Sequence, residues 1–232
     1  MKTRCRLSTN AATGILNTAG EMNATEIVLG LHHKHGMLDS FLGSFAQSIL
    51  KGTHRQMMVV KCLMPVNTMR RLMVAVPPKA EFEAGFYKWV ERLARIGGQL
   101  GCRVHFWAHP DTILRINGYL KKFHGNVRVE FSPMDDWDDL LLMSSKVAYD
   151  HLVVIVSARK GAISYQSSFE ELPTQITKYF SNCSLMLIYP DQLGDPLENL
   201  TFSSPRGQSE NPIYDHVSKW VYKWMKKGEE QG

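Results

Sequence analysis

The chemically most capable segment of the sequence is rich in histidine and lies in the N-terminal quarter. It contains His32, His33 and His35 and follows a short apolar run that stops at Gly30. Imidazole groups titrate near neutral pH and bind transition metals. The segment therefore has two chemical interpretations, a sensor of pH or of a ligand such as phosphate, or a metal site built on a His-x-x-His pair. The alternative interpretation is a solvated loop.

Metal binding and catalysis both lack supporting residues nearby. No Cys, Asp or Glu is spaced closely enough to the histidines to complete a metal shell. Four aspartates crowd positions 135–139, but the first turn of a helix favours carboxylates and accounts for them. Ser44 has no Gly-x-Ser-x-Gly context, and no Walker lysine follows the glycines. The sequence therefore predicts no metal site, no catalytic residue and no enzyme.

Gly30, Gly43 and Ser44 have a different use, which depends on the elements around them. Residues 27–29 form a short apolar strand, the apolar residues of 38–50 recur with helical spacing, and residues 57–60 suit the next parallel strand. The intervening loop lies at the carboxyl edge of a sheet, where open α/β folds bind ligands. Glycines there let a phosphate approach main-chain N–H groups at a helix start. These three residues are the predicted nucleotide-binding set.

The rest of the chain alternates strands with helices. The expected strands are 72–76, 103–108, 127–131, 152–156 and 185–189, and the expected helices are 83–100, 112–123, 136–145 and 167–179. Five strands alternating with four helices make a complete Rossmann-like domain. A strand at 3–7 and a weak helix at 10–22 precede the first unit. Residues 153–188 repeat its order, but Ser157 and Glu170 replace the glycines, so no second nucleotide site is predicted.

Composition limits the classes of function. The 232 residues are 44% hydrophobic, enough for one or two domains, and the net charge of +5 is a mild excess without a long basic tract. Nucleic-acid binding is therefore not predicted. Four widely spaced cysteines indicate reduced, mostly buried thiols rather than disulfides or zinc. No apolar run is long enough to span a membrane, so the chain is expected to be soluble.

The C-terminal segment changes character. Residues 194–211 are rich in Ser, Pro, Gly and Asn, which is typical of a loop or mobile tail. An amphipathic helix is predicted at 212–227, with tryptophans on its apolar stripe and lysines around them. Such a helix could lie on a membrane surface, and the simpler alternative is that its tryptophans dock on the body of the protein.

Two stretches resemble known families. Gly30 and the pair Gly43-Ser44 resemble the universal stress protein motif, which reads Gly, two residues, Gly, nine residues, Gly, then Ser or Thr; His33 replaces the middle glycine. The stretches GLHHKHGMLDSFLGS, PVNT (65–68) and VAVPPKAEFEAGF (74–86) resemble the cytosolic C-terminal region of bacterial sodium/proton (cation/proton) antiporters. In that region tandem universal stress protein-like lobes follow the membrane transporter.

The resemblance implies a fold and a domain organisation. The fold class is α/β, with Rossmann-like, universal stress protein-like parallel sheets that carry helices on both faces. Residues 1–65 are expected to be the C-terminal part of a first lobe, 69–191 a complete second lobe, and 192–232 a tail. The chain would then begin inside a domain of a longer protein.

The resemblance also implies a function. The chain would be a soluble cytosolic regulatory or sensing domain of an antiporter, held at the cytoplasmic side of the inner membrane by the transmembrane domain of the same protein. The alternative is a stand-alone nucleotide-binding protein of the stress type, with ATP or another adenine nucleotide at Gly30, Gly43 and Ser44. Uncovered strand edges predict a homodimer, or instead an internal pairing of strands 57–60 and 185–189.

Overall fold

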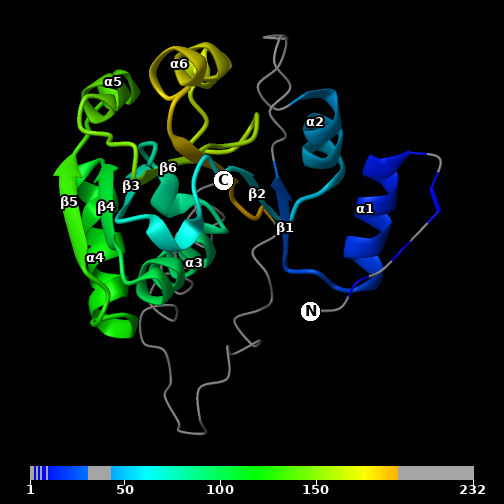
Figure 1. Ribbon diagram of the computed structural model, residues 1–232, viewed down its shortest axis with the longest axis horizontal. Coiled ribbons are helices and arrows are strands. Elements are labelled where there is room, and N and C mark those ends of the chain that lie inside the picture. The colour runs from blue at the N-terminus through cyan, green and yellow to red at the C-terminus, as the bar shows by residue number, and fades with distance from the viewer. Residues whose placement is uncertain (1–2, 4, 6, 9, 31–42, 193–232) are drawn as a thin grey trace, which may run out of the picture. The chain divides into compact units, whose positions relative to one another are not determined.

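A seven-stranded mixed sheet organises the part of the chain that the structure describes (Figure 1). The structure is a computed structural model and describes residues 3, 5, 7–8, 10–30 and 43–192. His32, His33, His35 and the helix expected at 212–227 lie outside the described residues. Among the described residues, no helix combines the length and the apolar character needed to cross a membrane.

The strands lie in the order β1-β2-β7-β6-β3-β4-β5. Their bounds are β1 (Glu26–Gly30), β2 (Gln56–Lys61), β3 (Arg71–Ala75), β4 (Arg103–Ala108), β5 (Val129–Pro133), β6 (His151–Val156) and β7 (Ser184–Tyr189). The helices are α1 (Ala11–Glu21), α2 (Gly43–Gly52), α3 (Phe86–Leu100), α4 (Pro110–Phe123), α5 (Leu140–Ser144) and α6 (Leu172–Tyr179). Short 3-10 turns occupy Val66–Thr68, Ala80–Phe82, Trp137–Asp139 and Ser167–Glu170.

One antiparallel junction joins two parallel groups of strands. The N-terminal unit (β1, α2 and β2) is parallel within itself, as is the five-stranded part (β3 to β7). Strand β2 runs antiparallel to β7, with Met57 opposite Tyr189 and Lys61 opposite Leu185. This confirms the predicted internal pairing of these strands. As a consequence, the carboxyl ends of β1 and β2 lie at the same edge of the sheet as the amino ends of the other five strands.

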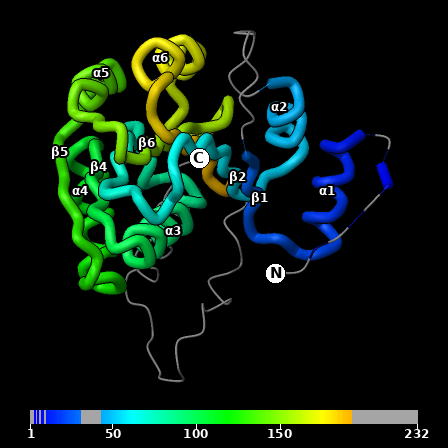
Figure 2. Tube along the Cα trace, in the orientation of Figure 1, coloured from blue at the N-terminus to red at the C-terminus, as the bar shows by residue number. Residues whose placement is uncertain are grey.

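Helices cover both faces of the sheet (Figure 2). Alternate strand residues point to opposite faces, and the buried residues accordingly form two clusters. One cluster packs Met73 and Val153 against α5 and α6, and continues under α1 and α2 through residues such as Ile49. The other packs Val74 and Val154 against α3 and α4. The sheet is therefore a shared scaffold on which the helices of both faces pack.

Several predicted boundaries need correction. The described residues Thr3, Cys5 and Leu7 form no strand, and Leu7 is fully exposed. The helix expected from residue 83 begins at Phe86, because a 3-10 turn and Gly85 come first. The strand expected at 127–131 is shifted to 129–133. The helix expected at 136–145 begins as a 3-10 turn with an aspartate capping box, which agrees with the helix-start interpretation of the four aspartates.

Candidate functional site

The predicted nucleotide-binding residues lie at the two ends of the connection between β1 and α2. Gly30 is the last residue of β1, and Gly43 is the first residue of α2 with a positive φ of 62°. Ser44 follows and is exposed. The first turn of α2 carries no acidic residue, so its N–H groups and the helix dipole favour an anion. The loop that would complete the site lies outside the described residues.

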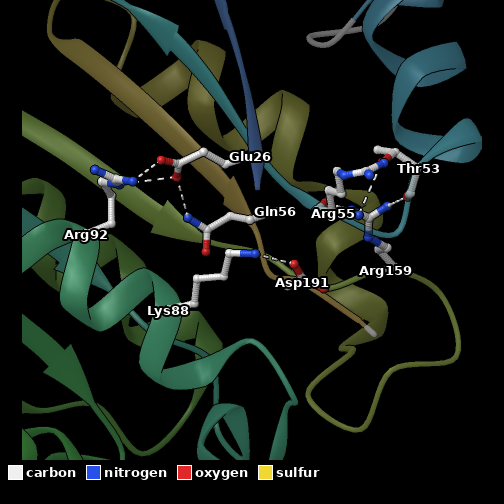
Figure 3. Close-up of polar contacts among 8 residues, drawn as sticks. All are labelled: Glu26, Thr53, Arg55, Gln56, Lys88, Arg92, Arg159 and Asp191. Carbon is white, nitrogen blue, oxygen red and sulfur yellow. Dashed lines mark hydrogen bonds and ion pairs between the residues drawn. The ribbon is translucent and has the colours of Figure 1, made fainter. Parts of the chain in front are cut away.

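An arginine from the five-stranded part holds the other end of α2 (Figure 3). Arg159, in the loop after β6, donates hydrogen bonds to the carbonyl oxygens of Leu50 at 2.8 Å, Thr53 at 2.5 Å and Arg55 at 2.7 Å. Burial lowers the pKa of Arg159, yet guanidinium stays protonated in proteins. A cation at the last carbonyl groups of a helix also complements its dipole. Any movement of α2 is therefore coupled to the loop after β6.

A second polar contact ties the start of β1 to α3 (Figure 3). The carboxylate of Glu26 accepts hydrogen bonds from Nε of Arg92 at 3.2 Å, from Nη2 of the same side chain, and from Gln56 Nε2 at 3.1 Å. Gln56 is fully buried. Glu26 and Gln56 begin the adjacent strands β1 and β2, whereas Arg92 lies in α3. These bonds therefore attach the N-terminal unit to the helix that covers the second face of the sheet.

The third contact joins α3 to the end of β7. Lys88 Nζ lies 2.5 Å from the carboxylate of Asp191, and both side chains are largely buried. Gly85 packs so closely under Asp191 that an added Cβ would lie 2.4 Å from its main-chain nitrogen. The next residue, Gln192, donates its main-chain N–H to the carbonyl oxygen of His54. The Gln192–His54 bond and the contacts of Arg159 and Arg92 form the seam between the N-terminal unit and the five-stranded part, and Lys88 and Gly85 hold in place the segment that carries Gln192.

The equivalent position in the five-stranded part is closed by the protein itself. Glu83 accepts hydrogen bonds from the main-chain N–H and the hydroxyl of Ser164, at 2.9 and 2.8 Å. Burial raises the pKa of Tyr189 to about 12 despite a hydrogen bond with Ser157. The Glu83 carboxylate thus accepts the hydrogen bond of the Ser164 N–H. In a glycine loop, a main-chain N–H of this kind would be donated to a phosphate. The main-chain N–H of Ser164 is therefore already satisfied by a protein acceptor.

Sequence reasoning missed the seam. Glu26 and Arg92 are 66 positions apart, and Arg159 and Thr53 are 106 positions apart, so no local motif links them. A weaker signal exists, because Gln56 is a polar residue directly before the apolar run 57–60. A polar residue that is buried at such a position needs a hydrogen-bond partner, so Gln56 predicts a polar contact nearby.

Comparison with known proteins supports the fold. Residues 4–61 match the model of the Universal stress protein family, and no curated protein matches the chain. The cytoplasmic domain of a prokaryotic cation chloride cotransporter aligns at TM-score 0.52 and 10% identity, over 80% of this chain and 71% of that one. Together the family match and this likeness confirm the predicted α/β, Rossmann-like, universal stress protein-like fold.

Two universal stress proteins of known structure are also similar to the chain. A universal stress protein from Archaeoglobus fulgidus aligns at TM-score 0.49 and 15% identity, over 78% of this chain. A putative universal stress protein from Pseudomonas aeruginosa aligns at TM-score 0.48 and 15% identity, over 83% of this chain and 73% of its own. The chain spans 65% of the length of the Archaeoglobus protein.

Proposed function

We propose that this chain is a regulatory, non-catalytic domain of a cation/proton antiporter, on the cytoplasmic side of the membrane. The observation that carries the proposal is the seam, because Arg159 joins the end of α2 to the five-stranded part. A ligand at the amino end of α2 would then act on both groups of strands. The likeness to a cation transporter's cytoplasmic domain supports this assignment.

Regulation of this kind requires a ligand that binds two states of the protein with different affinity. An adenine nucleotide at the amino end of α2, near Gly30, Gly43 and Ser44, is the proposed ligand. The histidines at 32, 33 and 35 would add sensitivity to pH. The proposed partners are the transmembrane antiporter domain of the same protein and a second copy of the chain.

The test is transport by the full-length product of the gene in inside-out vesicles, with and without residues 1–232 of this sequence. Removal of the region is expected to leave cation/proton exchange measurable and to abolish its response to added nucleotide. A gene product without transport activity would reject the proposal. So would exchange that responds equally to nucleotide in both forms.

A second candidate function is nucleotide binding by a free-standing protein, which the family match over residues 4–61 favours. Calorimetry with ATP, ADP and AMP tests it directly on the chain. Ser44→Asp would place a carboxylate at the start of α2, where the dipole tolerates it but a phosphate would be repelled. Asn182→Asp adds the same charge at an exposed distant position and serves as the control. Absence of heat at millimolar nucleotide would eliminate this function.

A further inference from the structure

Four adjacent parallel strands carry a basic residue at, or directly before, their first position at one edge of the sheet. Arg71 of β3 is the register partner of His151 in β6 and of Arg103 in β4. Arg128 comes directly before Val129, the partner of Val104, and so stands level with Arg103. Register partners in a parallel sheet point to the same face. The fold therefore lines up guanidinium groups that are far apart in the sequence.

These residues line an open pocket of about 290 Å³. Its lining consists of Arg70, Arg71, Arg103, Arg128, Asp150 and His151. The volume lies at the lower limit of small-molecule pockets, so it suits a small anionic group better than a whole nucleotide. The pocket lies at the amino ends of its strands. Because β2 is antiparallel to β7, this is the same edge of the sheet at which β1 ends with Gly30, but the pocket is built on other strands.

The carboxylates near the pocket do not balance its charge. Glu130 is shared by Arg71 at 3.2 Å and Arg103 at 2.6 Å. Asp150 reaches Arg70 at only 3.5 Å, and Arg70 stays 84% exposed. Four guanidinium groups against these two carboxylates leave an excess of two positive charges. Like charges held this close repel one another, and a bound anion would relieve the repulsion.

The next layer of the same face adds a buried polar group. His105 is two residues along β4 from Arg103, and only 8% of its surface is exposed. Its Nε2 contacts the hydroxyl of Ser132 at 2.9 Å, whereas its Nδ1 has no hydrogen-bond partner and lies 3.7 Å from the Glu130 carboxylate. His105 does not line the pocket, but with Glu130 it makes the sheet face below the arginines polar.

We propose that this pocket binds a phosphomonoester group. Guanidinium forks match phosphate oxygens in pairs, and Arg is preferred over Lys where such planar recognition matters. Arg70 and Arg128 are the exposed members of the set, and neither is paired with Glu130 among the ion pairs of the described residues. They are therefore the residues most exposed to a ligand, although Arg70 lies 3.5 Å from Asp150 and Arg128 donates one hydrogen bond to the carbonyl oxygen of Gly101. The phosphate could belong to a free metabolite or to a lipid headgroup, and the experiment distinguishes the two.

The experiment measures binding by the whole chain at low ionic strength, where charge interactions are least screened. One arm titrates inorganic phosphate and glycerol phosphate by calorimetry. The other uses sedimentation with vesicles of phosphatidylcholine, with and without phosphatidic acid. The variant Arg70→Gln/Arg128→Gln removes two pocket charges. Its control, Lys79→Gln/Arg115→Gln, removes two exposed charges that follow the opposite ends of the strands.

We expect saturable binding that weakens at least tenfold in Arg70→Gln/Arg128→Gln and less than twofold in the control. Binding in the soluble arm identifies a metabolite, and binding only to phosphatidic acid vesicles identifies a lipid. No binding in either arm would overturn the proposal, as would equal losses in the two double variants. If the pocket variant fails to fold, phenylglyoxal labelling of the wild type decides. Phosphate must then protect Arg70 and Arg128 but not Arg115.

Discussion

Arg159 Nη1 lies 2.5 Å from the carbonyl oxygen of Thr53, across the boundary between the five-stranded part and the N-terminal unit. The same guanidinium also reaches Leu50 and Arg55. One side chain thus donates hydrogen bonds to three main-chain carbonyl oxygens at and just after the end of α2. The relationship explains how a unit with only two strands of its own is held to the rest of the protein, and it can be tested by substitution.

Arg159→Lys is expected to lower the free energy of unfolding by about 1–3 kcal/mol, because a single ammonium group cannot satisfy three carbonyl groups. Urea unfolding followed by circular dichroism measures the loss. Arg115→Lys, at an exposed position of α4, should change the midpoint very little. Equal midpoints for the two variants would show that Arg159 does not hold the seam together.

Gly85 and Gly118 make a matched pair for the packing at the end of β7. A Cβ on Gly85 would lie 2.4 Å from the nitrogen and 2.7 Å from the oxygen of Asp191, whereas a Cβ on Gly118 meets nothing. We expect Gly85→Ala to cost about 1–3 kcal/mol through overpacking. Gly118→Ala, inside the exposed face of α4, should gain up to about 1 kcal/mol. Thermal unfolding distinguishes the signs, and a stabilising Gly85→Ala would contradict the described packing.

Glu91 should make stability depend on acid pH. Burial acts to raise its pKa, but hydrogen bonds from His124, Arg95 and Tyr119 outweigh burial and lower the pKa below its ordinary 4.5. The folded state therefore binds fewer protons than the unfolded state in mild acid. The contribution of Glu91 is present above the unfolded pKa and is lost as pH falls through the folded pKa.

Glu91→Gln tests this pH dependence. At neutral pH the variant should be less stable than the wild type by about 1–3 kcal/mol, because the partners of Glu91 lose a charged acceptor. The deficit should shrink as the pH is lowered from neutrality to about 3. Urea midpoints measured across this range give the difference directly. A deficit that stays constant with pH would mean that Glu91 has an unshifted pKa.

The four cysteines should separate into two classes. Cys5 and Cys62 are exposed, while Cys102 and Cys183 are buried, so the prediction of mostly buried thiols is wrong for the first two. Burial raises the pKa of Cys183 to about 11, which suppresses the reactive thiolate. Iodoacetamide labelling with mass spectrometry should modify Cys5 and Cys62 in the folded protein. Cys102 and Cys183 should react only in urea, and rapid labelling of either would contradict their burial.

Local sequence pattern predicted the elements well because each strand is a short apolar run between turn residues. The bounds of β4 were predicted to the residue, and those of β6 and β7 to within one. Periodicity does not state which strands are neighbours, so the seam around Arg159 could not be inferred. The arginine pocket could not be predicted for the same reason, because Arg71, Arg103 and Arg128 become neighbours only through the register of their strands.

Of the predicted nucleotide site, the structure describes Gly30, Gly43 and Ser44 but not the loop between them. Gly43 was selected as part of the glycine motif, and the structure gives it a φ of 62° at the start of α2. Binding of nucleotide by Gly30, Gly43 and Ser44 stays a prediction. The spacing of the motif indicates where a phosphate would fit, but it does not give the affinity for nucleotide. The roles assigned to His32, His33 and His35 are likewise still predictions.

The most direct test of the regulatory role combines Ser44→Asp with transport by the full-length protein. Cation/proton exchange in inside-out vesicles is measured with and without millimolar ATP, ADP or AMP, for the wild type, Ser44→Asp and Asn182→Asp. We expect at least one nucleotide to change the wild-type and Asn182→Asp rates at least twofold and to leave Ser44→Asp unchanged. A wild-type exchange rate that no nucleotide changes, or an equal change of rate in the wild type and Ser44→Asp, would contradict the account.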